Sequence, residues 1–504
     1  MAAMSLYTWN NLLKKPALLL ATIFMLTAQT FAQMAIKKPL VNEIPPDSAD
    51  VEYYGKKHFW RAAAETAGFN VGLWAYDRFI QKGDFAYISL NSIKENFKHG
   101  FIWDNDKLGT NTFLHPYNGS LYFNAGRANG FNFWQSELFA IGGSAMWEMF
   151  MECEYPSTND IIATPIGGAV LGETLFRASD AVLDDRSGGW ERFGREAACF
   201  IMSPMRGFNR IVTGQAWRKR ATTGRIFGDP LFSMQISLGY KMLEYQGHFH
   251  NIQNGFAAQI DLEYGDRFQL KSKHPYDYFT LSAELALMKG QPFLSQLEIK
   301  GRLLGREIFE NYHSHLSIGL YQHFDFFDSD TIDGLDRVPY KLGIPACIGA
   351  GMLFRDVPEH KWRVDAYLHF NGVILGSLLS DHYRADERNY NWASGFSVKG
   401  GANVVVDNDR LSFQLMHHYY RLFTFKGYRE DTDLKQVNSK TLNVMGDHSC
   451  ASFNITEFRA NIKLIRGLYA TLSFTNYARH TRYRNYPRIK STSMSLRTML
   501  TYKF

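Results

Sequence analysis

After its first thirty or so residues, this chain of 504 residues has no long hydrophobic run. A membrane-spanning helix needs roughly 20 consecutive apolar residues, and no later segment approaches that length. Cysteine is scarce as well, and the four cysteines are too far apart in sequence for metal-ligand spacing: Cys153, Cys199, Cys347 and Cys450. Free thiols are therefore expected, with a Cys153–Cys199 disulfide as the alternative in an exported protein.

The signatures of several other chemistries are also absent. The sequence has no glycine loop that would cradle phosphate, no Cys/His cluster and no Gly-x-Ser-x-Gly elbow. Its charge excess of +6 is spread along the chain, whereas nucleic-acid binding favours a concentrated basic face. We therefore expect no nucleic-acid partner, no metal site and no cofactor.

The amino-terminal residues have the pattern of an export signal. Adjacent lysines precede an apolar run over residues 16–26, and Thr30-Phe31-Ala32 then supplies a cleavage site for signal peptidase. The sequence therefore predicts a signal peptide over residues 1–32, followed by a polar, proline-bearing linker over residues 33–55.

From about residue 225 the sequence has a period of two, and aromatic residues make up 15% of the whole chain. In one typical segment, apolar residues alternate with mostly polar ones: Val364, Ala366, Leu368 and Phe370 with Arg363, Asp365, Tyr367 and His369. Neighbouring side chains on a strand point to opposite faces, so each segment has one apolar and one polar face. Segments of about ten residues or more, with short turns between them, match a tilted crossing of the hydrocarbon core better than a water-soluble sandwich.

About twelve such segments occur, an even number as in bacterial single-chain barrels. They are residues 229–245, 254–267, 277–289, 292–309, 313–327, 340–355, 361–377, 391–406, 410–426, 452–465, 468–481 and 491–504. The last segment ends the chain at Phe504, which resembles the closing strand read by the bacterial barrel assembly machinery. The sequence therefore predicts a transmembrane β-barrel of about 12 antiparallel strands over residues 225–504, in the outer membrane of a Gram-negative cell.

Residues 56–220 have a helical pattern instead. Thr164-Pro165 predicts a helix start, with threonine as the N-cap and proline at the first helical position. Gly168 and Gly172 are four residues apart and would let another backbone approach closely. We expect this α-helical domain to plug the barrel lumen or to cap its periplasmic mouth, with its charges matched to those of the barrel wall.

An ordered set of motifs lies within the helical domain. It comprises His115-Pro116-Tyr117-x-Gly119, Ser144-x-Met146-Trp147-Glu148, Pro156-Ser157-x-Asn159-Asp160 and Gly167-Gly168-x-x-x-Gly172-Glu173, together with Arg127 and Arg177. Over about residues 100–215 the set resembles an uncharacterised family of Gram-negative envelope proteins, a domain of unknown function. The resemblance implies the same architecture and implies no activity.

The polar residues of these motifs allow a catalytic interpretation. His115 is a candidate general base, and Glu148 or Asp160 is a candidate carboxylate to orient it. Arg127 or Arg177 is then a candidate to hold an anionic group of a substrate.

The same residues also allow a structural interpretation, which we favour. Glu173 and Arg177 are four apart in the order that suits an ion pair within one helix. Asn159 would cap a helix, and Glu148 would pair with a charge on the barrel wall. Contact with a ligand, including Arg127, Asn159, Glu173 and Arg177, remains a third interpretation.

These patterns leave two classes of function open. The first is a passive barrel that serves envelope integrity, acts as a scaffold or forms a plugged channel. The second is a membrane-embedded enzyme that acts on envelope lipid or a lipid-linked glycan. The expected partners are outer-membrane lipid, the assembly machinery through Phe504, and a small solute or another envelope protein.

Overall fold

A computed structural model describes residues 56–504, apart from residues 249, 269–273, 312, 357–360, 408, 435 and 439–441. The predicted signal peptide and the linker up to residue 55 lie outside the described residues. The chain divides into two compact units, whose described parts are residues 58–174 with 231–504, and residues 56–57 with 175–230. We call the first the barrel unit and the second the small helical unit. All four cysteines are free, so the alternative Cys153–Cys199 disulfide is not formed.

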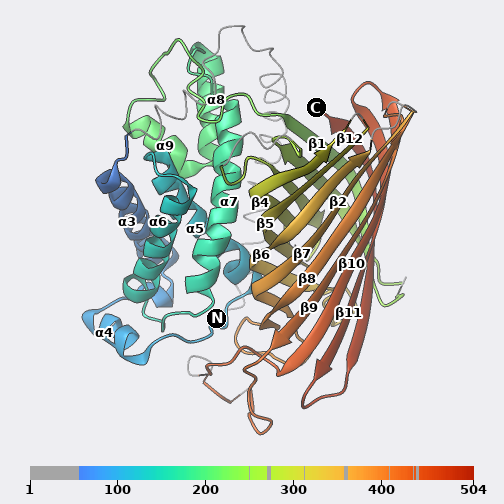
Figure 1. Cartoon of the computed structure of the whole chain (residues 1–504). Helices are drawn as coiled ribbons and strands as arrows, with labels where there is room; N and C mark the ends of the chain where they lie inside the picture. The colour runs from blue at the N-terminus through green and yellow to red at the C-terminus, as the bar shows by residue number, and fades with distance from the viewer. Residues whose placement is uncertain are drawn as a thin grey trace. The chain divides into compact units, whose positions relative to one another are not determined.

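The carboxyl-terminal part of the barrel unit is a closed antiparallel barrel, in which each strand pairs with its neighbours in sequence (Figure 1). Its strands are β1 (Phe232–Tyr245), β2 (Gln253–Tyr264), β3 (Phe279–Met288), β4 (Leu294–Glu310), β5 (Ser314–Asp328), β6 (Lys341–Asp356), β7 (Trp362–Leu379), β8 (Tyr390–Val406), β9 (Leu411–Thr424), β10 (Ser449–Ile465), β11 (Leu468–Tyr483) and β12 (Ile489–Lys503). The seam joins β1 to β12, with Ile236 opposite Tyr502. The prediction of about twelve strands is confirmed.

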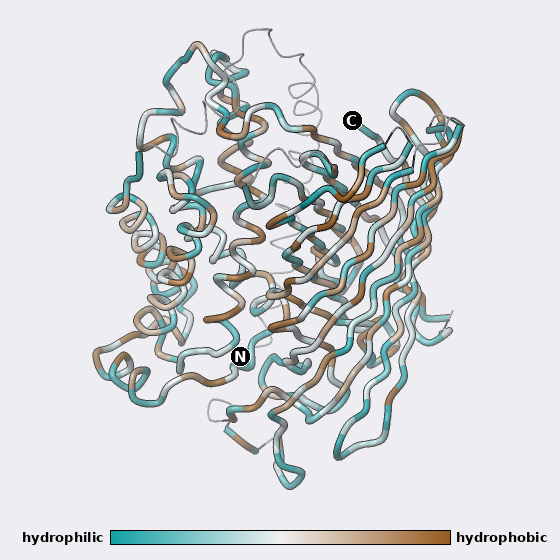
Figure 2. Tube along the Cα trace, viewed as in Figure 1, coloured by the Kyte–Doolittle hydropathy of each residue, from teal (hydrophilic) through white to brown (hydrophobic). Residues whose placement is uncertain are grey.

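The two faces of the barrel wall have the predicted chemistry. On β12, Leu496, Leu500 and Tyr502 are exposed on the outside, whereas Arg497 and Thr501 are buried inside. Much of the remaining wall repeats this alternation, as Figure 2 shows in the alternating hydrophobic and hydrophilic residues along the strands, although parts of some strands are buried on both faces. An apolar outer face and a polar inner face are the arrangement of a membrane-spanning barrel.

The two ends of the barrel differ. At one end most strands are joined by short turns, such as Arg466-Gly467 between β10 and β11, although the connection between β2 and β3 over residues 265–278 is longer. At the other end the connections over residues 329–340, 380–389 and 425–448 are longer. Since β1 begins and β12 ends at the short-turn end, both ends of the barrel sequence lie there.

The helices of the barrel unit precede the strands. They are α3 (Phe59–Tyr76), α4 (Leu90–His99), α5 (His115–Ala128), α6 (Phe133–Met146) and the first part of α7 (Asp160–Val182), with short π- or 3-10-helical segments η1 (Asp77–Gln81), η2 (Asp84–Ala86), η3 (Thr110–Leu114) and η4 (Trp147–Met151). No described helix has both the length and the hydrophobicity needed to cross a bilayer.

These helices pack against the outside of the barrel wall. On β5, His323 and Asp325 face the lumen beside Lys399, so Phe324 and Phe326 face outward. Phe324 and Phe326 are nevertheless buried, because they pack in one hydrophobic cluster with residues of α5 and α7. Figure 1 shows α5 and the first part of α7 on the side of the barrel formed by β4–β6.

The described helices of the barrel unit do not fill the lumen, so the prediction of a plug is wrong. A polar contact also places them outside, since Gln322 Nε2 on the outer face of β5 donates to the Ile166 carbonyl of α7 at 3.1 Å. The helices of the barrel unit thus cover the outside of several strands, and their described contacts do not place them in the lumen.

The small helical unit contains the end of α7, α8 (Gly189–Met202) and α9 (Pro204–Val212). Buried ion pairs hold it together: Arg206 pairs with Asp180, and Arg210 pairs with Asp185 at 2.7 Å. The predicted helical domain of residues 56–220 is therefore not one unit, because its first part shares a hydrophobic core with the barrel.

Candidate functional site

Three candidate residues from separate segments meet in the helices of the barrel unit. His115 begins α5, Glu148 lies in η4 and Asp160 begins α7. One nitrogen or oxygen atom from each lies within 4.8 Å of the other two. His115 Nε2 and Asp160 Oδ1 are 3.8 Å apart, and both carboxyl groups are almost completely buried. We call these three residues the histidine–carboxylate site.

Local hydrogen bonds hold the two carboxyl groups in place. The Ser157 amide donates to Glu148 Oε2 at 2.7 Å, and the Asp160 amide donates to Ser157 Oγ at 3.3 Å. Ser157 therefore both orients Glu148 and caps the start of α7. Asn159, which was predicted to be a cap or a ligand contact, accepts a hydrogen bond from the Asp104 amide at 3.2 Å.

The site is electrostatically unusual because it gathers carboxyl groups away from water. Burial raises the pKa of Glu148 to about 8 and also raises the pKa of Asp160. The negative charge of Asp104 raises both pKa values further, and a hydrogen bond between Asp104 and Asp160 adds to the shift of Asp160. Burial lowers the pKa of His115, so its imidazole is neutral at neutral pH.

Two acidic residues that lie next to the histidine–carboxylate site were not identified from the sequence. Asp104 contacts Asp160, and Glu152 shares a hydrogen bond with Glu148. Burial also raises the pKa of Glu152, with Glu148 as the next contribution. Neither residue stands in a periodic pattern, and the one available signal was the grouping of acids at residues 104–106 and 152–154.

Arg127 and Glu173 form a separate buried pair farther along the same helices. Arg127 Nε and Nη2 donate to Glu173 Oε2 and Oε1 at 2.7 and 3.1 Å, and both side chains are at most 1% exposed. They lie about 18 Å along α5 and α7 from the histidine–carboxylate site, at 1.5 Å per residue. Arg177 belongs to the small helical unit, where its guanidinium lies 3.8 Å from the ring centre of Phe227.

Close approach of α5 to α7 makes both clusters possible. A Cβ atom on Gly119 would lie 1.8 Å from the Thr164 carbonyl oxygen, and one on Gly168 would lie 2.5 Å from the Gly119 backbone. A Cβ on Gly172 would meet the ring of Phe123 at 2.8 Å. The predicted role of Gly168 and Gly172 in close helix approach is therefore confirmed.

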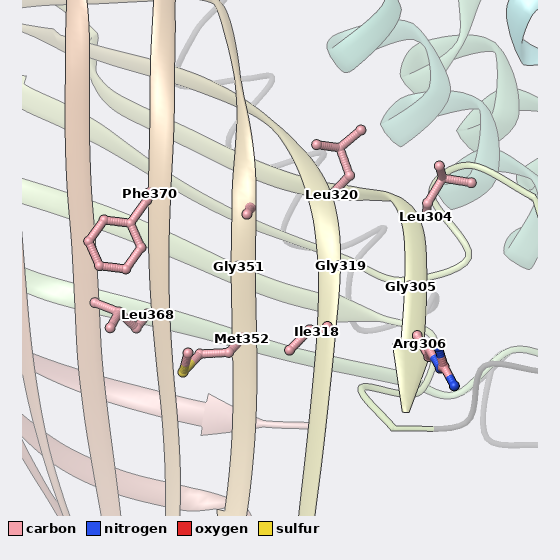
Figure 3. Close-up of a pocket in the computed structure, with 11 residues that line it drawn as sticks. Leu304, Gly305, Arg306, Ile318, Gly319, Leu320, Gly351, Met352, Leu368 and Phe370 are labelled. Atoms are coloured by element: carbon pink, nitrogen blue, oxygen red, sulfur yellow. The ribbon is translucent and has the colours of Figure 1, made fainter. Parts of the chain in front are cut away.

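A shallow groove of about 420 Å³ lies elsewhere, on the outside of β4–β7 (Figure 3). Its lining is apolar except for Arg306, and its side chains include those of Ile318, Leu320, Met352 and Phe370. These residues point away from the lumen, so the groove belongs to the outer apolar surface. It contains none of the predicted site residues.

Comparison with known proteins supports the sequence resemblance. Residues 100–205 match the family model described as a domain of unknown function, DUF3943. The histidine–carboxylate site and the Arg127–Glu173 pair both lie inside this match. None of the curated proteins matches the chain.

Several solved structures match about half of this chain with low similarity. The NanC porin is 8% identical, with a TM-score of 0.25, over 53% of this chain and 100% of that one. The outer membrane channel DcaP of Acinetobacter baumannii is 8% identical, with a TM-score of 0.22, over 55% and 97%. The CymD monoaromatic hydrocarbon channel is 10% identical, with a TM-score of 0.23, over 54% and 88%.

Proposed function

We propose that this protein is a non-conducting barrel of the Gram-negative outer membrane, which supports the helices and their buried polar site. The observation that carries the proposal is the filling of the lumen towards the long-loop end. A predicted signal peptide over residues 1–32 supports export, and the apolar outer wall supports insertion into lipid. The barrel then acts as a scaffold and not as a pore.

We expect a hydrophobic cluster contributed by the barrel itself to block the lumen. The rings of Tyr340 and Tyr477 stack with centroids 4.1 Å apart. The same buried cluster contains Leu243, Tyr245, Phe327, Leu342, Ile344, Cys347, Val373, Leu378, Tyr420, Leu422, Phe453 and Ile455. A densely packed apolar layer leaves no room for water or ions, so it opposes conduction.

Buried ion pairs reinforce the layer on the side of the short turns. Arg497 donates to Glu284 at 2.5 Å and to Glu457 at 2.8 Å, and Lys399 pairs with Asp325. Removing one partner of a buried ion pair costs about 3–5 kcal/mol, because the other charge is left buried without compensation. These side chains therefore do not readily swing aside. A polar cavity of about 260 Å³ remains towards the short turns.

The proposal predicts that the purified protein forms no pores. In planar lipid bilayers we expect no conductance steps from the wild-type protein, because the apolar layer crosses the lumen. The matched control is a variant that combines Tyr477→Ala with a shortened 329–340 connection, which removes the Tyr340–Tyr477 stack and is expected to conduct. Stable conductance steps from the wild-type protein at ordinary voltages would contradict the proposal.

A membrane-embedded enzyme that acts on envelope lipid or lipid-linked glycan is the second candidate. One observation favours it, namely the meeting of His115, Glu148 and Asp160 in one buried site. Its test is a set of alanine variants at these three positions. If the variants change the envelope lipids of the cell while the barrel still assembles and keeps its heat-modifiable mobility on gels, the enzyme is favoured.

The proposed partners follow from the same surfaces. Membrane lipid would contact the outer apolar wall, and the assembly machinery would recognise the last strand. The Phe504 amide donates to the Met234 carbonyl at 2.9 Å, so this terminal residue takes part in closing the seam. An envelope protein or small solute remains a proposed partner of the loops or the polar cavity.

A further inference from the structure

We propose that His115, Glu148 and Asp160 form a binding site for one divalent transition-metal ion. The three ligand atoms lie within 4.8 Å of one another and come from three different helical segments. Atoms that share an ion at about 2.0–2.2 Å lie roughly 3–4 Å apart. Small side-chain rotations would therefore bring all three onto one ion. This inference goes beyond the proposed support function.

The distribution of charge supports a missing cation. Elsewhere in these helices a buried acid faces an arginine, as Glu173 faces Arg127. Among the described residues, no lysine or arginine forms an ion pair with Glu148, Glu152 or Asp160. Buried carboxylates without a cation or a metal are costly, so the site favours a positive ion.

An unpartnered atom gives an independent indication. Asp160 is 2% exposed, and its Oδ1 atom accepts no hydrogen bond among the described residues. This is the same oxygen that lies 3.8 Å from His115 Nε2. A buried carboxylate oxygen that faces an imidazole nitrogen and lacks a donor is well placed to ligate a metal.

The ligand types indicate the class of ion. Calcium and magnesium prefer all-oxygen sites, whereas imidazole nitrogen suits zinc, copper, iron and nickel, and carboxylate oxygen also suits manganese. Carboxylate oxygens complete the sets that these metals take in proteins. Three protein ligands leave at least one coordination position for water or another ligand.

Metal content of the full-length protein tests the proposal. After EDTA treatment, the protein is incubated with ZnCl2 or MnCl2, desalted and analysed by inductively coupled plasma mass spectrometry. We expect at least one tightly held equivalent of one of these metals, and one equivalent fewer in His115→Gln and Asp160→Asn. Unchanged content in these variants, or no metal in the wild-type protein, would overturn the site.

A second histidine–carboxylate group provides the matched control. Glu307, Glu310 and His315 also lie close together, but near a turn between strands and more exposed. His315→Gln is expected to hold as much tightly bound metal as the wild-type protein. If the variants at the buried site fail to assemble, spin-echo spectroscopy of Mn²⁺ bound to His315→Gln decides instead. Imidazole nitrogen coupling would support the site, and its absence would overturn it.

A different observation carries a second inference. We infer that α3 and α6 lie against the acyl chains of the bilayer. On α6 the exposed residues Trp134, Leu138 and Ile141 are apolar and follow helical spacing, with exposures of 57%, 67% and 45%. The polar residues Ser136 and Ser144 are buried on the opposite side. This polarity is the reverse of that of a helix on a water-soluble surface.

The same reversal occurs on α3. Its buried residues include Glu65, Thr66 and Asn70, whereas Val71 is 47% exposed and its exposed neighbours Gly68 and Gly72 carry no polar side chain. Asn70 Nδ2 donates to the Gly143 carbonyl of α6 at 3.0 Å, so polar groups face inward between these helices. Interior polar contacts with an apolar exterior are typical of helices in lipid.

Continuity with the barrel wall identifies the occupant as lipid. The helices and the barrel belong to one unit, and the helices bury outward residues such as Ile299 and Phe324 that would otherwise meet acyl chains. The side of the helices that faces away from the barrel would then contact the acyl chains in place of these strand residues.

Spin-label accessibility tests the lipid contact. A full-length variant without its native cysteines carries a single nitroxide at L138C and is reconstituted in phosphatidylethanolamine–phosphatidylglycerol vesicles. We expect relaxation by oxygen and protection from a water-soluble nickel chelate, as for a control label at L472C on the outer face of β11. A loop label at D431C should show the opposite. Access to nickel at L138C, or access to neither reagent because a protein covers it, would overturn the inference.

Discussion

Replacing Glu173 with glutamine is expected to destabilise the helices of the barrel unit by about 3–5 kcal/mol, because it removes the carboxylate that pairs with buried Arg127. The guanidinium is 1% exposed, so water does not readily replace the lost charge. Denaturant titration, combined with limited proteolysis of residues 58–174, measures the loss. The strands should keep their heat-modifiable mobility on gels, since neither residue belongs to the barrel wall.

A double variant separates the cost of an unpaired charge from the cost of lost packing. Arg127→Met combined with Glu173→Leu removes both charges and keeps apolar bulk, so it should recover most of the lost stability. Arg127→Met alone should resemble Glu173→Gln, because it leaves the carboxylate without its bidentate partner. Equal stability of Glu173→Gln and the wild-type protein would contradict the assigned role.

Gly119→Val is expected to force α5 and α7 apart and to cost about 3 kcal/mol or more. The added Cβ would lie 1.8 Å from the Thr164 carbonyl oxygen, and that backbone atom cannot move aside alone. Rapid proteolytic cleavage within residues 100–174 would reveal the separation. The histidine–carboxylate site would be lost together with the packing, because His115 and Asp160 begin these two helices.

Gly142→Ala is the matched control for Gly119→Val. Gly142 also lies in a helix interior, but a Cβ there meets nothing within 4 Å. Alanine should therefore stabilise α6 by about 0.5–1 kcal/mol, because glycine loses more conformational freedom on folding. Similar damage from both substitutions would show that helix propensity, and not the close approach of α5 and α7, decides the outcome.

The strands were predictable because lipid and lumen impose opposite chemistry on alternate residues. The segment predicted at 491–504 is observed as Ile489–Lys503, and its apolar residues face outward as expected. The period of two depends on the backbone geometry of one strand alone. The period of two can therefore be recognised in the sequence without knowing whether lipid, water or protein covers each face of the strand.

The same independence explains why the position of the helices was not predictable. Phe324 on β5 has the outward pattern of a lipid-facing residue, yet helices cover it. Apolar helix packing and lipid make the same demand on that side chain, so the sequence cannot distinguish them. On α6 the helical period shows that Leu138 and Ser136 lie on different faces, but it does not show which face meets solvent.

The sequence identified the residues of the candidate site by their chemical type, but it did not show that they lie together in the fold. His115, Glu148 and Asp160 were recognised as chemically capable, but their meeting depends on three segments and two helix starts. The structural interpretation paired Glu173 with Arg177 because local spacing favours that pair. The structure shows Glu173 in a bidentate pair with Arg127, a long-range contact that no local spacing indicates.

The seam between β1 and β12 constrains how the protein is made. Every other neighbouring pair of strands is consecutive in the chain, whereas this pair joins the first strand to the last. Until β12 pairs with β1, a partly formed barrel therefore carries an unpaired edge on β1, and open edges recruit other strands. Closure of the cylinder removes both open edges at once, so the pairing of the first strand with the last protects the whole sheet from joining other chains.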